Sequence, residues 1–261
     1  MSKRAIQTIL LLTAFIGLIS CGNRLEEKGF AVGPATEGND SDTVNGISKD
    51  SLKFATRPSN VLLTGIPKYR IATIYKVNYS KKKVPFIGSN DYHFNYSSYG
   101  ETYGNQWNAN YLPGFEAVYG YNMVNISHYD IEKQKQKNFF EKPVLIKTLY
   151  YPSFSKDTLN YQPVNRNYFM ITVYDADTNK DGFINVKDLR RFYRFDINAD
   201  AKSELIPTNY SVDKSEYDPA NDFVYIFAKL DKNENGQIDD GEEVHIFWID
   251  LKDPQKTGRQ Y

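Results

Sequence analysis

Two twelve-residue stretches of this chain place oxygen-bearing side chains at alternate positions. The first, DTNKDGFINVKD, covers residues 177–188, and the second, DKNENGQIDDGE, covers residues 231–242. Each begins with Asp, has Gly at its sixth position and ends in a carboxylate. This spacing suits a cation that takes six to eight oxygen ligands in a flexible cage, with the glycine allowing the sharp turn between ligands. The chemistry that both stretches predict is binding of Ca²⁺.

The ligand positions can be assigned within each stretch. Calcium loops of this length donate oxygens from positions 1, 3, 5, 7, 9 and 12, where position 7 contributes its backbone carbonyl and position 9 often acts through water. In the first loop the predicted ligands are Asp177, Asn179, Asp181, the carbonyl of Phe183 and Asp188, with Asn185 acting through water. In the second loop they are Asp231, Asn233, Asn235, the carbonyl of Gln237 and Glu242, with Asp239 acting through water. We expect two calcium sites, the first tighter because it has three direct carboxylates against two.

Both loops resemble the EF-hand calcium loop. The first also resembles the dockerin calcium repeat, in which Asp at position 12 is followed by Leu, as in Asp188-Leu189. A dockerin has a second repeat close by and helices throughout, whereas these loops start 54 residues apart and the second is followed by the strand-like run VHIFWI at 244–249. The resemblance therefore implies the metal ligands and not cohesin binding. The alternative is a pair of polar hairpin turns rich in Asp, Asn and Gly.

The segments that precede the two loops predict strands in place of the helices of an EF-hand. FMITVY at 169–174 and FVYIF at 223–227 are β-branched and aromatic, which favours strand. We therefore expect EF-hand-like loops that join strands. After Asp188, the spacing of Leu189, Phe192 and Tyr193 predicts a short helical turn, followed by a strand near Phe195.

The N-terminal region indicates export and a lipid anchor. Residues 1–20 have a basic start and an apolar run too short to span a membrane, which predicts a signal peptide. The run LISC ending at Cys21 resembles the bacterial lipobox, which implies lipidation of that cysteine and a location in the bacterial cell envelope, at the outer membrane or cell surface. A plain secretory signal is the alternative. Residues 21–51 are polar and predict a flexible tether with a mean span of about 30 Å.

The remaining residues, 52–261, predict one all-β calcium-binding domain. Tyr and Phe are abundant, at 21 and 16, and long amphipathic helices are absent from the pattern. Without the leader the chain has two more acidic than basic groups, which argues against nucleic acid as a partner. Four strand–turn–strand units begin near Arg70, Met123, Phe169 and Phe223. They predict an antiparallel meander, either a four-bladed propeller-like form or a β-sandwich.

An aromatic segment at 91–122 interleaves Tyr and Trp with Asn, Gly and Ser. Tyr103, Trp107 and Tyr111 in this segment are candidates for a glycan-binding surface, because stacking faces and amide groups suit sugars. The alternative is that these aromatics pack an irregular loop onto the sheet.

The sequence contains no catalytic signature. His93, His128 and His245 are scattered, and neither a phosphate-binding glycine loop nor a serine-nucleophile elbow is present. The sequence favours a non-enzymatic, calcium-binding envelope lipoprotein in which calcium is structural. The alternatives are a calcium-stabilised glycan-binding lipoprotein, one that binds another envelope protein, and a polymer hydrolase whose two carboxylates sequence alone does not pair.

Overall fold

The computed structural model describes residues 29–32, 43–44, 47–48, 54–87 and 112–261, and every regular element among them is a β-strand. All strand pairs are antiparallel, which confirms the predicted all-β antiparallel meander. Within these ranges no helix is long and apolar enough to cross a membrane. The predicted signal peptide, Cys21 and the aromatic candidates Tyr103, Trp107 and Tyr111 lie outside the described residues.

The largest sheet has nine strands. Its path runs β15–β14–β12–β9–β7–β5–β4, with β6 added to β5 and β8 added to β7. The strands are β4 (Thr56–Leu63), β5 (Tyr69–Tyr79), β6 (Pro85–Ile87), β7 (Phe115–Asp130), β8 (Lys135–Asn138), β9 (Leu145–Pro152), β12 (Tyr168–Tyr174), β14 (Arg191–Asp196) and β15 (Lys202–Glu204).

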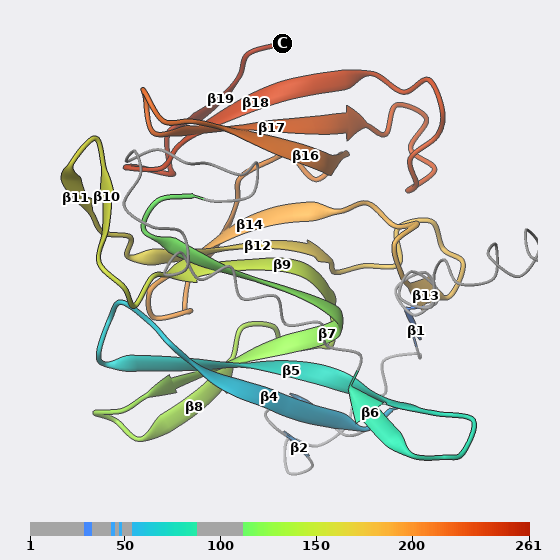
Figure 1. Cartoon of the computed structure of the whole chain (residues 1–261). Helices are drawn as coiled ribbons and strands as arrows, with labels where there is room; N and C mark the ends of the chain where they lie inside the picture. The colour runs from blue at the N-terminus through green and yellow to red at the C-terminus, as the bar shows by residue number, and fades with distance from the viewer. Residues whose placement is uncertain (1–28, 33–42, 45–46, 49–53, 88–111) are drawn as a thin grey trace, which may run out of the picture.

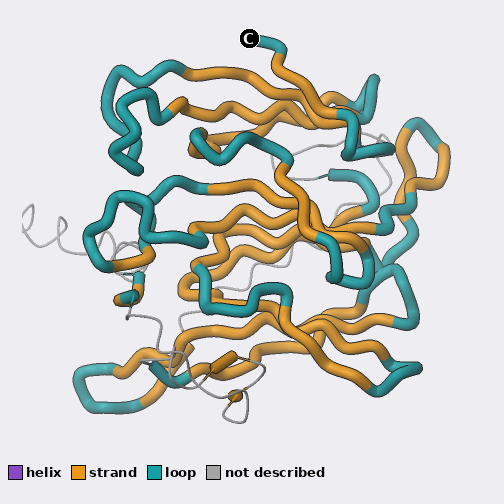
Figure 2. Tube along the Cα trace, turned by 180° about the vertical axis from the view of Figure 1, so that it is seen from behind, coloured by secondary structure: helices purple, strands orange, loops and turns teal. Residues whose placement is uncertain are grey.

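This sheet folds over at β7, which is shared by two layers. The first part of β7, from Phe115 to Tyr119, pairs with β9, and the part from Met123 onward pairs with β5. The register shifts between these parts, and Asn122 at the shift has a positive φ of 59°. A second sheet of four strands covers the other side, so that three layers are stacked (Figures 1 and 2). The lower layer contains β4, β5, β6, β8 and the later part of β7, and the middle layer contains the first part of β7 with β9, β12, β14 and β15. The upper layer consists of β16 (Tyr210–Asp218), β17 (Phe223–Leu230), β18 (Val244–Asp250) and β19 (Thr257–Arg259).

The middle layer is buried on both faces, as its sequence pattern requires. All seven residues of β12 are buried, which explains why its sequence is apolar except for Thr172 and lacks alternation. Phe169 and Ile171 point into the core shared with the lower layer, whereas Tyr168 and Met170 point into the core shared with the upper layer. Successive side chains of one strand therefore hold the three layers together.

Three two-stranded ribbons complete the described structure. They are β1 (Phe30–Ala31) with β13 (Phe183–Ile184), β2 (Thr43–Val44) with β3 (Ile47–Ser48), and β10 (Asp157–Leu159) with β11 (Gln162–Val164). Phe30 and Ile184 of the first ribbon contribute to a third apolar cluster, beside Tyr174 at the end of β12.

The four units predicted from the sequence are not four propeller blades. The first two units, represented by Ile71 and His128, pair directly with each other, and the third continues the same nine-stranded sheet. Only the fourth unit lies in a separate sheet. The sheet continues across the unit boundaries because β7 is long enough to pair with strands of two layers. Of the two predicted arrangements, the observed sheets fit the β-sandwich-like meander and not the propeller.

After Asp188, the predicted helical turn is wrong, whereas the strand predicted near Phe195 is present. Residues Arg191–Asp196 form β14, which pairs with β12. Phe192 packs into the upper core and Tyr193 into the lower core, so the strand buries both aromatics where a helical turn would place them on one face.

A buried ion pair joins the middle and upper layers at one end. The guanidinium of Arg166, just before β12, donates to both carboxylate oxygens of Asp222 at 3.0 and 2.7 Å. Both side chains are 3% exposed. Arg166 also donates to the carbonyls of Leu251 at 2.7 Å and Pro113 at 2.9 Å, so its charge and its donors are matched.

Candidate metal centre

The two predicted calcium loops lie at the other ends of β12 and β17. The loop at 177–188 connects β12 to its neighbour β14, and the loop at 231–242 connects β17 to its neighbour β18. Both loops therefore close hairpins between paired strands, which confirms the expectation of EF-hand-like loops joining strands. One loop belongs to the middle layer and the other to the upper layer.

In the first loop, alternate side chains accept hydrogen bonds from the backbone. The two carboxylate oxygens of Asp177 accept from the N–H groups of Asp181 at 3.0 Å and Gly182 at 2.9 Å. The side-chain oxygen of Asn179 accepts from the Asp181 N–H at 3.0 Å, and Asp181 accepts from the Phe183 N–H at 2.9 Å. These bonds curl the chain around the side-chain oxygens of positions 1, 3 and 5.

Position 12 closes the first loop. Asp188 is 2% exposed, and its Oδ2 accepts from the Asn185 N–H at 2.9 Å. Its Oδ1 accepts from the Thr178 N–H at 2.7 Å. Burial raises the pKa of Asp188 above its ordinary value even with these hydrogen bonds. A cation beside this carboxylate would offset the cost of keeping its charge buried.

The second loop repeats this hydrogen-bond pattern position by position. Asp231 accepts from the N–H groups of positions 5 and 6 at 3.1 and 2.9 Å. Asn233 accepts from the Asn235 N–H at 3.1 Å, and Asn235 accepts from the Gln237 N–H at 3.0 Å. Glu242 at position 12 accepts from the position-9 N–H at 3.2 Å. Two segments in different sheets thus adopt the same backbone conformation.

The donor chemistry of the loops fits calcium. Carboxylate, amide and carbonyl oxygens are ligands for a hard cation, and the loops offer none of the thiolate or imidazole ligands that zinc prefers. In the second loop, Oε1 of Glu242 is shielded from solvent and has no hydrogen-bond partner among the described residues. A buried carboxylate oxygen without a partner is costly, and coordination to a cation would satisfy it.

The carboxylates of the described residues do not form a preorganised metal site. Among the described residues, no three His, Cys, Asp or Glu side chains converge on a point that could hold a metal ion. In the second loop, the side-chain amides of Asn233 and Asn235 instead donate to Asp239 at 3.0 and 2.7 Å. Coordination of calcium in this loop would require these side chains to turn toward a common centre.

The two loops touch each other through Thr178 and Gly236. The hydroxyl of Thr178 lies within hydrogen-bond distance of the Gly236 carbonyl and of Asp188 Oδ1, and it accepts from the Leu189 N–H at 2.9 Å. Gly236 has φ +77°, and a Cβ there would lie 1.9 Å from the Thr178 carbonyl oxygen. Only glycine fits at this position. Through the Thr178 hydroxyl, Asp188 at position 12 of the first loop is linked to Gly236 at position 6 of the second.

A third turn with related geometry was not predicted from the sequence. Asp196 accepts from the N–H groups of Asp200 and Ala201 at 2.7 and 2.9 Å, as position 1 does in the calcium loops. The spacing Asp196, Asn198, Asp200 was the available signal. Here, however, Lys137 forms an ion pair with Asp200 and lowers its pKa. A lysine therefore supplies the positive charge that the ligand positions of the two predicted calcium loops lack.

Two described histidines have structural partners. The Nε2 of His128 lies 3.0 Å from the Ile197 carbonyl, and the Nδ1 of His245 lies 2.7 Å from the Tyr210 hydroxyl. Of the predicted aromatic segment, Phe115 is 1% exposed and belongs to the upper core, so the packing alternative holds for that residue.

Comparison with known proteins agrees with the first loop. An EF-hand family model matches residues 174–193, which include the whole loop at 177–188 and the start of β14. This match supports calcium binding by the chain. No curated protein is significantly similar to it. Fold and site together define an all-β protein that has an EF-hand-type calcium loop between strands.

Proposed function

We propose that this protein is a calcium-stabilised lipoprotein of the bacterial cell envelope that binds two Ca²⁺ ions. The observation that carries the proposal is the shared hydrogen-bond pattern of the loops at 177–188 and 231–242. The ligands would be Asp177, Asn179, Asp181, the Phe183 carbonyl and Asp188 in one loop, and Asp231, Asn233, Asn235, the Gln237 carbonyl and Glu242 in the other, with Asn185 and Asp239 acting through water.

The role proposed for calcium is structural. The loops meet at Thr178 and Gly236, and this contact joins the middle layer to the upper layer. Without a cation, Asp177, Asp181 and Asp188 repel one another across a short loop. Calcium bound in both loops would fix their conformations and so hold the two layers together at this end.

Calorimetric titration of the full chain with calcium tests the number of sites. We expect Asp177→Ala to remove one site and Asp231→Ala to remove the other. Asp200→Ala is the matched control, because it changes a turn of similar geometry whose charge is already balanced by Lys137. Unchanged stoichiometry in both loop variants would refute the assignment.

The envelope location rests on the sequence of the leader. We propose that residues 1–20 are removed and that Cys21 is acylated. The tether predicted at 21–51 is not free throughout its length, because Phe30–Ala31 pairs with β13 and Phe30 is buried. The full chain should then partition into detergent and stay with membranes after a salt wash, whereas Cys21→Ser should not. Equal membrane retention of the two forms would contradict the anchor.

A second candidate function is glycan binding. We infer it from Tyr103, Trp107 and Tyr111, and a cleft elsewhere in the described structure, lined by Tyr119 and Tyr150, offers further aromatic surface. If the aromatic segment is the binding surface, Trp107→Ala abolishes binding on a glycan array with little change in melting temperature. If Trp107 is core, the same change costs about 3–5 kcal/mol of stability.

A further inference from the structure

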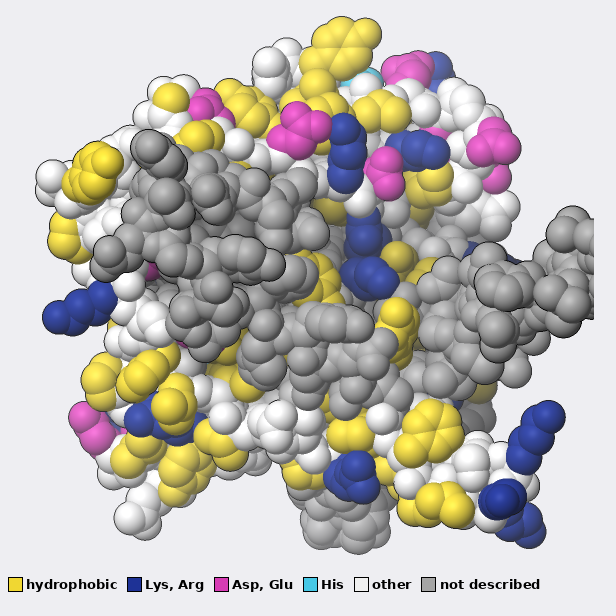
Figure 3. All heavy atoms as spheres, in the orientation of Figure 1, with side chains coloured by type: hydrophobic (Ala, Val, Ile, Leu, Met, Phe, Trp, Pro, Cys, Tyr) yellow, Lys and Arg dark blue, Asp and Glu magenta, His cyan; other side chains and the backbone are white. Residues whose placement is uncertain are grey.

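The hairpin of β5 and β6 projects from the lower layer at one side of the molecule (Figure 1). Its tip, residues 79–86, has the sequence YSKKKVPF, and every residue of it is exposed. Tyr79, Val84 and Phe86 are large apolar side chains that are 62%, 58% and 37% exposed. Figure 3 shows basic side chains projecting beside hydrophobic ones over this hairpin, at the lower right. The tip therefore presents apolar surface and positive charge together.

The apolar side chains of the tip lie on both of its faces. Tyr79 is directly opposed to Pro85, and Phe86 is directly opposed to Asn78. Opposed residues of an antiparallel pair share a face and successive residues alternate, so Tyr79 and Phe86 point to opposite faces of the hairpin. Such a tip can bury all of its apolar groups by entering a lipid interface end-on, whereas a flat protein surface would cover only one face.

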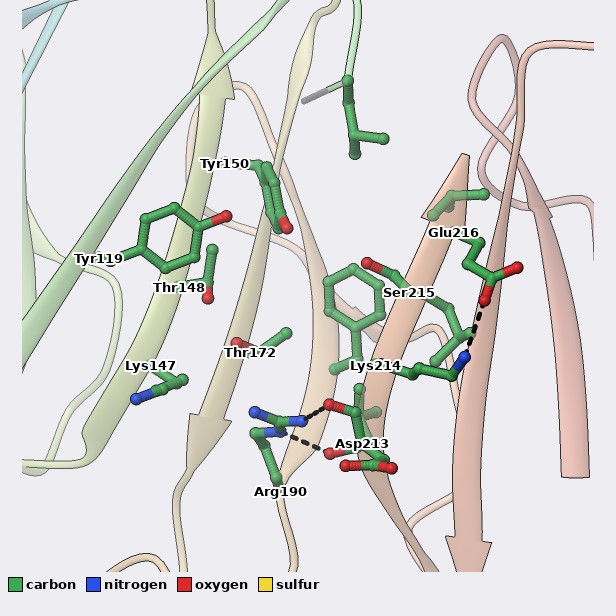
Figure 4. A pocket seen from close by; sticks show the side chains of 15 residues that line it. Tyr119, Lys147, Thr148, Tyr150, Thr172, Arg190, Asp213, Lys214, Ser215 and Glu216 are labelled. Carbon is green, nitrogen blue, oxygen red and sulfur yellow. Dashed lines mark hydrogen bonds and ion pairs between the residues drawn. The ribbon is translucent and has the colours of Figure 1, made fainter. Parts of the chain in front are cut away.

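The three lysines of the tip, at 81–83, have no acidic partner within the part of the chain that the structure describes. Elsewhere exposed lysines are paired. Lys214 meets Glu216 at 2.8 Å beside the cleft between the middle and upper layers (Figure 4), and Lys68 meets Glu132 at 2.9 Å. The tip itself contains neither Asp nor Glu. Its positive charge is therefore left to complement an anionic surface.

Lys83 has a backbone conformation that favours glycine. Its φ is 58°, and its N–H donates to the Ser80 carbonyl at 2.8 Å, which closes the turn. The N–H of Ser80 donates to the Val84 carbonyl at 3.0 Å. Hairpin loops of this length usually have Gly at the left-handed position, because a side chain there is strained. A lysine kept against this preference is expected where its charge serves a function.

The N-terminal segment reaches the described structure beside the base of this hairpin. The Nζ of Lys76 on β5 donates to the Gly29 carbonyl at 2.9 Å, and β1 lies on the same side of the molecule as the hairpin (Figures 1 and 2). From Cys21 to Gly29 the chain spans at most about 29 Å. From Lys76 to Lys81 the hairpin arm covers about 17 Å. A lipid on Cys21 would therefore place a membrane within reach of the tip.

We propose that the tip at 79–86 docks on an anionic membrane surface, with its lysines among the headgroups and Tyr79, Val84 and Phe86 in the interfacial layer. Lysines alone would protect an edge hairpin from pairing with other chains, but they do not explain the apolar side chains exposed around them. A soluble polyanion would pair with the lysines and leave those side chains in water. Lipid interfaces accommodate both kinds of group.

This inference rests on the proposed lipid anchor, because the anchor brings the membrane close to the tip. Anchor and tip together would attach the domain at two points and so fix its orientation on the membrane. Two attachments are also what stable membrane association requires, because a single weak one is readily reversible.

Tryptophan fluorescence of the full chain in vesicles tests the docking. Tyr79→Trp places a reporter in the tip. Tyr161→Trp is the matched control, because Tyr161 is 87% exposed at the β10–β11 turn on the opposite side of the molecule (Figure 1). The vesicles are phosphatidylcholine with brominated acyl chains, with and without phosphatidylglycerol. We expect quenching of the signal added at 79 only with phosphatidylglycerol, and no quenching of the signal added at 161.

Flotation of the same vesicles separates failure of the tip from failure of the anchor. If the anchor proposal is wrong, the chain does not float with neutral vesicles, but anionic vesicles still report on the tip. Absence of quenching at 79 in anionic vesicles that carry the chain, or equal quenching at 79 and 161, would overturn the tip proposal alone. A chain that floats with neither kind of vesicle contradicts both proposals.

Replacing the charges tests the role of the lysines in the Tyr79→Trp chain. Lys81→Gln, Lys82→Gln and Lys83→Gln together should abolish the quenching, because each lysine near an anionic surface contributes about fivefold to binding and three contribute on the order of a hundredfold. Lys133→Gln with Lys135→Gln is the control, since both are exposed lysines of the β7–β8 hairpin. Quenching that survives in the triple variant, or that the control variant also loses, would refute the tip.

Replacing the apolar groups separates a membrane from a soluble polyanion. Val84→Ser with Phe86→Ser should also remove the quenching and leave the melting temperature nearly unchanged, because both side chains are exposed. Docking that is unaffected by this double variant and is displaced by soluble heparin would identify a polyanion site and refute insertion into the membrane.

Discussion

The middle and upper layers are joined in different ways at the two ends of their interface. At one end Arg166 and Asp222 meet as a buried ion pair, so the protein supplies both charges. At the other end the loops at 177–188 and 231–242 touch through Thr178 and Gly236, and their ligand positions supply only negative charge. One end of the interface is therefore complete in the chain itself, whereas the other end, if the proposed calcium binding holds, takes its positive charge from a bound cation.

This difference makes the two ends separable by experiment. A substitution that breaks the ion pair should lower the free energy of unfolding equally with and without calcium. Damage at the loops should change how strongly stability responds to calcium, because a ligand that binds only the folded state stabilises it in proportion to its occupancy.

The largest effect is expected from breaking the ion pair. Arg166→Leu leaves Asp222 buried without its counter-charge and should cost about 3–5 kcal/mol in urea unfolding, with or without calcium. Lys137→Gln is the control, because its ion pair with Asp200 is exposed and should contribute little. A loss at Arg166 that calcium fully restores would contradict the idea of two independent ends.

The next effect separates two glycines at the same loop position. Gly182 and Gly236 both have positive φ, but an added Cβ at Gly182 meets nothing within 4 Å, whereas at Gly236 it meets the Thr178 carbonyl oxygen. Gly182→Ala should cost about 1–2 kcal/mol for the left-handed backbone, and Gly236→Ala a further 1–3 kcal/mol, roughly, for the overpacked contact. Equal losses in thermal melts would show that the contact between the loops does not hold the layers.

A smaller effect distinguishes the calcium affinities of the loops. Asp188→Asn and Glu242→Gln each remove one direct carboxylate and should weaken calcium binding at their own loop about tenfold, since ligand charge sets affinity. We expect the first loop to be the tighter site, so Asp188→Asn should alter the earlier phase of a calorimetric titration. An effect of both variants on the same phase would contradict the assignment of one site to each loop.

The smallest effect is a change in pH dependence. Burial raises the pKa of Asp188 above 3.8, so without calcium the folded state binds this proton more readily than the unfolded chain, and acidification through that window favours folding at this group. With calcium the carboxylate must be ionised, and acidification releases the ion. The melting-temperature difference between calcium and chelator should therefore shrink as pH falls from 7 toward 4. A difference that stays constant would contradict the role of Asp188.

The loops were predictable because their chemistry is local. Every ligand of the first loop, from Asp177 to Asp188, lies within twelve consecutive residues, so spacing alone specifies the turn. The strands around them were also predictable, because a run such as the one before Asp177 can be buried only in a sheet covered on both faces.

The interface between layers was not predictable, because its parts lie far apart in the chain. Arg166 and Asp222 are 56 residues apart, and the local sequence around either residue does not predict that the two form an ion pair. The predicted helical turn after Asp188 failed for a related reason. Leu189, Phe192 and Tyr193 have helical spacing. Pairing of this segment with β12, however, buries Phe192 in the upper core and Tyr193 in the lower core, and that burial outweighs the local pattern.

The most direct test of the central claim is thermal unfolding of the full chain in millimolar calcium, in excess chelator and in magnesium. Each occupied site should add about 2.7 kcal/mol at a hundredfold excess of calcium over Kd, which corresponds to roughly 5–10 °C in a domain of this size. We predict that calcium raises the melting temperature, that chelation lowers it, that magnesium substitutes poorly, and that the double variant Asp177→Ala, Asp231→Ala loses nearly all of the response. A melting curve indifferent to both calcium and chelator would contradict the account.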